Sequence, residues 1–256
     1  MATFNSGNPT LTEKIFDKSL NENAKAFGVM TVRGTINKFG FMLLMLMGSA
    51  MYIWSIYNPE TIATATALMF GGAIGGFVLA LVMMFKPNWA GYIAPGYAIL
   101  EGFFIGGISA YFNTVFAKQY PNMIIHAVGL TMGVALAMFL LYNFRIINVT
   151  NRLRSIIMSA TMGIALFYLI VWILSLFGIN MGFGPNDGSL LSIGISLFIV
   201  GIAAFNLLLD FDSIEKAAEM GAPKFMEWYG AFGLLVTLVW LYLEILKLLS
   251  KLNSRD

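Results

Sequence analysis

The sequence predicts an all-α, polytopic membrane protein that folds as a bundle of seven transmembrane helices. Hydrophobic residues make up 59% of its 256 residues and charged residues only 11%, whereas soluble domains carry about 25% charged residues. Apolar runs of about 20 residues, the length that crosses a bilayer as a helix, recur along most of the chain. The length suits one membrane domain and leaves no room for a large soluble one.

Residues 1–30 are expected to form a cytoplasmic N-terminal tail, and residues 31–256 the seven-helix membrane domain. The tail is polar and mixed in charge, and residues 12–26 could form a short surface helix. It lacks the apolar core of a cleavable signal peptide, so the first apolar run is expected to act as the insertion signal. The expected spans are 39–57, 61–85, 92–116, 123–144, 156–177, 189–209 and 225–249.

Turn-forming and charged residues separate these spans. Asn58-Pro59 closes the first, and Lys86-Pro87-Asn88 ends the second. The sixth follows a glycine-rich loop and is expected to continue as a helix to Met220. The stretch 221–230 indicates a break and then a short interfacial turn before the last span.

Glycines four residues apart occur in the second and third spans. Gly71, Gly72, Gly75 and Gly76 form two overlapping pairs, and residues 102, 106 and 107 are also glycines. Small residues at this spacing let a second helix approach closely, so intramolecular packing is the expected use.

The distribution of Lys and Arg places the N-terminus inside the cell, because cytoplasmic loops are enriched in these residues. With that orientation Lys118 is the basic residue of the outer loops, and the inner segments carry Lys14, Lys18, Lys25, Arg33, Lys38, Lys86, Arg145, Arg152, Arg154, Lys216 and Lys224. Seven spans put the C-terminus outside, although Lys247, Lys251 and Arg255 lie there. The alternative is a re-entrant last segment that returns inside.

The sequence lacks the residues that several classes of enzyme and metal-binding protein require. The chain has no cysteine, so it has no disulfide, thiolate metal site or cysteine nucleophile. His126 is the lone histidine, and neither a metal-binding cluster nor a phosphate-binding loop is present. A carboxylate-pair protease would be the one conceivable enzyme. We therefore expect no enzyme activity, no cofactor and no nucleic-acid partner.

Two acids interrupt the apolar runs and are the primary candidates for function. Asp210 follows the run 189–209, and Glu244 lies inside the last run. A carboxylate in hydrocarbon is costly unless it is paired, hydrated or protonated, so it marks a functional site by default. Our hypothesis is that these two carboxyls share a proton and gate a cation path. Ionisation of both would push them apart and leave hard oxygen ligands, which suit Ca²⁺.

Three further residues could extend a polar path. Asn206 lies four residues before Asp210 and shares its helix face. Asp212 is expected to face headgroups or water. Glu101 in the third span belongs either to the path or to a structural ion pair with Arg33 or Arg145.

Depth decides whether the two acids can meet. If the last helix enters the membrane near Gly233, Glu244 lies about 16 Å deep. If it enters at Pro223, Glu244 is nearly across the bilayer and cannot reach Asp210. Lys247, three residues further on, could instead neutralise Glu244 within its own helix.

The chain resembles the Bax inhibitor family, the transmembrane Bax inhibitor motif proteins, in a bacterial-type form. The resemblance lies in Glu101-Gly-Phe-Phe-Ile-Gly106, in Leu209-Asp-Phe-Asp-Ser-Ile214 and in Leu241-Tyr-Leu-Glu-Ile-Leu246. It implies a seven-helix bundle with the last helix central, in a bacterial inner (plasma) membrane. It also implies that Asp210 and Glu244 match a proton-sensitive latch on a calcium leak pore, with Glu here where aspartate is usual. Some bacterial relatives are linked to membrane-protease regulation, so a membrane-protein partner is the alternative function.

Overall fold

Helices form nearly all the regular structure in the computed structural model, which describes residues 28–179 and 187–254. The tail helix expected at 12–26 lies outside these residues. The helices are α3 (Val32–Ile56), α4 (Ile62–Phe85), the short 3₁₀ helix η1 (Pro87–Trp89), α5 (Ala90–Phe116), α6 (Met123–Asn143), α7 (Asn151–Leu176), α8 (Leu190–Glu219) and α9 (Met226–Asn253). Seven of them, counting η1 with α5, are long and apolar enough to cross a membrane, which confirms the predicted fold class.

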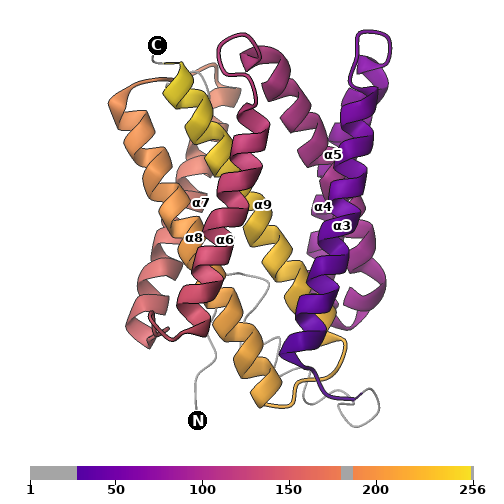
Figure 1. Ribbon diagram of the computed structural model, residues 1–256, viewed down its shortest axis with the longest axis vertical. Helices are drawn as coiled ribbons and strands as arrows, with labels where there is room; N and C mark the ends of the chain where they lie inside the picture. The colour runs from indigo at the N-terminus through magenta and orange to yellow at the C-terminus, as the bar shows by residue number, and fades with distance from the viewer. Residues whose placement is uncertain (1–27, 180–186, 255–256) are drawn as a thin grey trace.

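The last helix is the centre of the bundle. In Figure 1, α9 runs diagonally between α3, α4 and α5 on one side and α6, α7 and α8 on the other. It packs against α3, α5, α6 and α8. Within its most apolar stretch 72% of the residues are buried, against 11% for α6 and for α7. Most polar residues of α9 are therefore enclosed by protein, while α6 and α7 turn most of their surface toward the bilayer.

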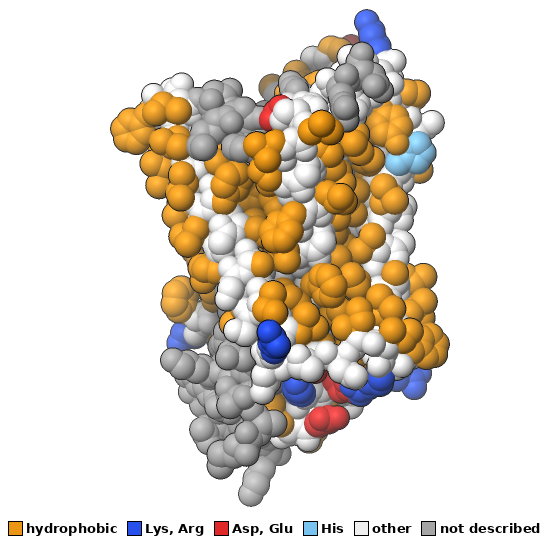
Figure 2. All heavy atoms as spheres, turned by 90° about the vertical axis from the view of Figure 1, so that its left-hand side faces the viewer, with side chains coloured by type: hydrophobic (Ala, Val, Ile, Leu, Met, Phe, Trp, Pro, Cys, Tyr) orange, Lys and Arg blue, Asp and Glu red, His pale blue; other side chains and the backbone are white. Residues whose placement is uncertain are grey.

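Basic residues gather at one end of the bundle, which we call the basic end. There α3, α5, α7 and α9 begin, and α4, α6 and α8 end. Figure 2 shows Lys and Arg side chains along the lower edge of a broad hydrophobic band. Such a band between two polar margins is the surface expected of a protein that spans a bilayer.

The start of α9 differs from the expectation. The turn predicted for residues 221–230 ends at Phe225, and α9 then continues without interruption through Gly230 and Gly233. A Cβ at Gly230 would lie 3.1 Å from Thr35 and 3.2 Å from Ile214, so this glycine allows close helix packing rather than a break. The helix runs from the basic end to the opposite end (Figure 1), which supports seven full spans over a re-entrant last segment.

Most of the predicted glycines of α4 and α5 permit close helix contacts, but a Cβ at Gly71 would meet nothing within 4 Å. Gly102 and Gly106 lie against the backbone of α3, where a Cβ at Gly106 would be 2.6 Å from a backbone oxygen. Gly72 lies against the backbone of α5 in the same way. These contacts join α3, α4 and α5 into one packed unit beside α9.

Candidate functional site

Asp210 lies at the contact between α8 and α9 and is 0% exposed. The hydroxyl of Thr237 on α9 donates a 2.5 Å hydrogen bond to its Oδ2 atom. Asn206, one turn earlier, is also buried, but its amide donates to Thr161 of α7 at 2.8 Å. Both side chains lie on α8 and are buried, but Asp210 contacts α9 and Asn206 contacts α7.

Glu244 on α9 is 1% exposed and has two kinds of donor. The Tyr168 hydroxyl of α7 lies 2.9 Å from each carboxylate oxygen, so it can donate to either. The ammonium group of Lys247 lies 3.0 Å from Oε1. Lys247 is thus the partner of a buried acid in its own helix rather than a loop charge.

The structure holds Asp210 and Glu244 in separate sites. Thr237, the donor to Asp210, precedes Glu244 by seven residues, which is about 10 Å along a helix. Because α9 begins at Met226, Glu244 lies about 27 Å from its start, well past the middle. This is the deeper of the two cases weighed from the sequence. The two carboxyls therefore do not pair as expected. Asp210 accepts from the Thr237 hydroxyl, and Glu244 is bound by the Tyr168 hydroxyl and the Lys247 ammonium group.

Asp212 does not face headgroups or water, contrary to the expectation. It is buried and forms ion pairs with Arg154 of α7 and with Lys216, whose Nζ lies 2.7 Å from Oδ2. Arg154 is buried as well. Two residues along a helix correspond to a rotation of about 200°, which turns Asp212 toward α7 while Asp210 faces α9.

Glu101 lies deep in α5, next to Tyr97 and α4. Its carboxyl is hydrogen-bonded to the Tyr97 side chain, and its Oε2 atom faces Gly76, 3.2 Å from the position of a Cβ there. It pairs with neither expected arginine, since Arg33 is exposed and Arg145 binds Glu215 at 2.6 Å. The Tyr97 ring meets Phe232 of α9 edge to face at 4.8 Å, which places Glu101 beside the central helix.

A fifth buried acid, Glu227, was not among the residues singled out from the sequence. It accepts hydrogen bonds from the Thr31 backbone N–H at 3.0 Å and from the Thr31 hydroxyl at 2.9 Å. Lys224 lies 3.0 Å from Oε1, and Lys38 binds Oε2. We call Thr31, Lys38, Lys224 and Glu227 the Glu227 clasp. It ties the start of α3 to the start of α9 at the basic end.

A short backbone pairing reinforces the clasp. The backbone N–H of Met30 donates to the carbonyl of Ala222 at 2.7 Å, and the backbone N–H of Lys224 donates to the carbonyl of Gly28 at 2.9 Å. A sequence signal did exist, because Lys224 and Glu227 are three residues apart at the start of a helix. The contribution of Thr31 and Lys38, almost 200 residues earlier in the chain, had no local signal.

A family model described as Bax inhibitor 1 like matches residues 8–254. The chain belongs to this family. The match covers all seven spanning helices of the Bax inhibitor 1-like fold described above, including both α8 and α9. A comparison with curated proteins found no match.

The buried acids of this Bax inhibitor 1-like protein lie singly among donors from the surrounding helices. Within residues 28–179 and 187–254, no three His, Cys, Asp or Glu side chains cluster closely enough to hold a metal ion. His126 lies beside the Tyr120 ring at 5.4 Å. The carboxyls of α8 and α9 instead receive hydroxyl, ammonium, guanidinium or backbone N–H donors, one acid at a time.

Proposed function

We propose that this Bax inhibitor 1-like protein is a pH-sensitive cation leak channel, permeable to calcium, that is gated at Asp210 and Glu244. The observation that carries the proposal is the Asp210 carboxyl, fully buried between α8 and the central helix and capped by Thr237. A carboxyl at such a position costs far less to bury when it is protonated than when it is ionised. Under this proposal, a channel with α7, α8 and α9 packed in this way is closed.

Opening requires α9 to move relative to α7 and α8. Such a movement breaks the bond from Thr237 to Asp210 and the bond from Tyr168 to Glu244, since each joins α9 to a neighbouring helix. The freed carboxylates then present oxygen ligands of the kind that Ca²⁺ accepts in flexible geometry. Ionisation of Asp210 at higher pH favours this movement, because water or a cation must then replace the apolar surroundings.

The two acids act at different depths rather than as one pair. Asp210 lies level with the middle of α9, and Glu244 lies closer to the end opposite the basic end. We place the basic end in the cytoplasm of a bacterium and the bundle in its inner membrane, because Lys and Arg favour the inner side. A cation that entered from outside would then meet Glu244 first and Asp210 second.

Calcium flux into proteoliposomes tests the proposal. Wild-type protein should admit Ca²⁺ to a trapped indicator at a rate that rises with pH. The double variant Asp210→Asn, Glu244→Gln should lose most of that pH dependence, whereas Glu60→Gln, at an exposed loop position, should retain it. A double variant with the wild-type pH profile would reject gating at these acids.

A regulatory protein that binds another membrane protein, such as a membrane protease, is the second candidate. The observation that favours it is the ion pair between Lys247 and Glu244, which already compensates this acid. Under this alternative the acids are structural and the leak is incidental. Cross-linking in native membranes distinguishes the two functions: a stoichiometric partner that persists in the double variant, together with an unchanged flux, supports regulation.

A further inference from the structure

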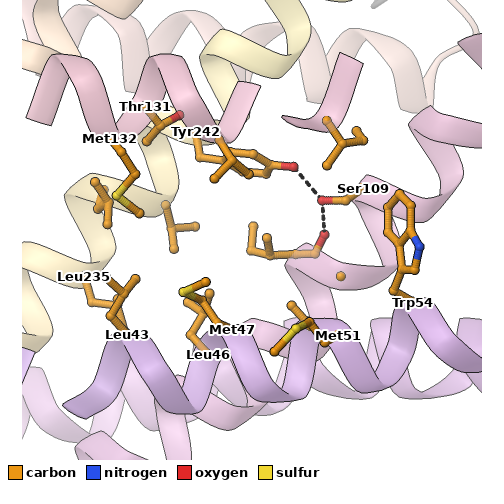
Figure 3. A pocket seen from close by; sticks show the side chains of 17 residues that line it. Leu43, Leu46, Met47, Met51, Trp54, Ser109, Thr131, Met132, Leu235 and Tyr242 are labelled. Atoms are coloured by element: carbon orange, nitrogen blue, oxygen red, sulfur yellow. Dashed lines mark hydrogen bonds between the residues drawn. The ribbon is translucent and has the colours of Figure 1, made fainter. Parts of the chain in front are cut away.

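A cavity of about 230 Å³ lies between α3, α5, α6 and α9, away from the acids described above. Figure 3 shows side chains from these helices around an open space, with Met47 and Met51 of α3, Met132 of α6 and Leu235 of α9 among them. It occupies the half of the bundle opposite the basic end, because its α3 residues belong to the second half of that helix. It is therefore at the depth of the bilayer hydrocarbon.

The cavity opens sideways between α3 and α6. Met47 and Met51 on α3 and Val128 and Met132 on α6 line it and are also exposed on the surface of the bundle. The residues of its floor, such as Leu235, are buried. α3 and α6 do not form a packed pair, so the mouth between them faces the bilayer.

Water has little to bind in this cavity. The hydroxyl groups of its lining are already hydrogen-bonded: Ser109 to Tyr242 at 2.6 Å and to the carbonyl of Ile105, and Thr131 to the carbonyl of Ala127 at 2.7 Å. A buried water needs two to four polar partners, and an apolar cavity of about 150 Å³ in another protein stays dry and binds benzene instead. Hydrocarbon suits this space better than water does.

We propose that the cavity is a binding site for one acyl chain of a membrane lipid. The bilayer supplies this ligand at the mouth, and lipid tails match the apolar lining in chemistry. Three methionines at the rim and wall have flexible, polarisable side chains that adapt to an irregular chain. The proposal does not depend on the cation leak, because the acids that gate the leak do not line the cavity.

Photolabelling tests the site in nanodiscs of a phospholipid that carries a diazirine in the middle of one acyl chain. After irradiation, peptide mass spectrometry should find label on Leu235, Leu238 and Tyr242 of α9, which line the cavity and are buried from the outer surface of the bundle. Label on α7, which faces the bilayer, serves as the internal reference. Absence of label from these three residues in wild-type protein would overturn the proposal.

A bulky side chain at the mouth of the cavity should block entry of the lipid chain, and the same substitution on an outer surface is the control. Val128→Trp should lower the ratio of α9 label to α7 label at least threefold, whereas Val78→Trp, on the exposed surface of α4, should leave it unchanged. Met132→Trp is the second variant if Val128→Trp does not fold. An unchanged ratio in a folded mouth variant contradicts the proposal. The proposal is also contradicted if α9 stays unlabelled and the rim methionines of α3 and α6 cross-link to a second copy of the chain, because a protein surface would then cover the mouth.

Discussion

Thr237 on the central helix donates a hydrogen bond of 2.5 Å to Asp210, which is completely buried in α8. Two turns further along the same helix, Glu244 receives its hydrogen bond from Tyr168 of α7. The two acids are thus held by different helices, and each can be perturbed without changing the donors of the other.

Removal of the donor to Asp210 should destabilise the bundle. In Thr237→Val the buried carboxyl loses this hydrogen bond while the shape of the side chain is kept, so the free energy of unfolding should fall by about 1–3 kcal/mol. Thr237→Ser keeps the hydroxyl and should lie closer to wild type. Denaturant unfolding in detergent micelles measures both, and equal stabilities for the two variants would show that the bond contributes little.

A methyl group at Gly34 should disturb the Glu227 clasp. A Cβ at this position would overlap the Glu227 carboxylate, so Gly34→Ala must displace either that side chain or the start of α3. We expect a loss of about 1–3 kcal/mol in the free energy of unfolding.

The control for Gly34→Ala is Gly48→Ala in the same helix, where a Cβ would meet nothing within 4 Å. Because alanine favours a helix over glycine, this change should be neutral or slightly stabilising. Thermal unfolding of both variants in one detergent checks the contrast. If Gly34→Ala also proves neutral, the clasp is looser than its contacts indicate.

The buried pair of Arg154 and Asp212 should respond strongly to loss of its cation. Arg154→Met leaves the buried Asp212 carboxylate with Lys216 alone, and breaking a buried pair typically costs about 3–5 kcal/mol. Arg152→Met, at an exposed position two residues earlier, should cost little. Expression level and unfolding temperature report the difference. Adding Asp212→Asn to Arg154→Met should restore part of the stability, since neither position of the former ion pair then carries a buried charge.

The loop before α8 should add a small pH-dependent contribution to stability. The backbone N–H of Ser189 donates to the Asp187 carboxylate and lowers the pKa of Asp187 below its ordinary value. A carboxyl whose pKa is depressed by folding stabilises the folded state above its unfolded pKa, and that contribution is lost as the pH falls through the folded pKa. Wild type should therefore unfold at a higher temperature than Asp187→Asn at pH 7, and the gap should close in acid. A gap that is independent of pH would contradict this origin.

Much of the architecture followed from local sequence. The apolar runs predicted seven spans, and the structure has seven helices that match them, with α8 continuing to Glu219. The burial of Asp210 and Glu244 also followed from their place inside or beside an apolar run. The partners of the buried acids could not be predicted from local sequence. Thr237, Tyr168 and Arg154 lie on other helices, and the rotation of each helix about its axis is set by packing.

Hydrophobic length by itself determined the helix count, the class of fold and the presence of acids in the bilayer, because the cost of exposing polar backbone to lipid is a property of each segment alone. Only the tertiary structure decided what each acid touches. The depth of α9 and the rotation of α8 place Asp210 on Thr237, Asp212 on Arg154 and Glu244 on Tyr168 and Lys247. These contacts depend on how close the helices can approach, and residues such as Gly230, by lacking a side chain, set that distance.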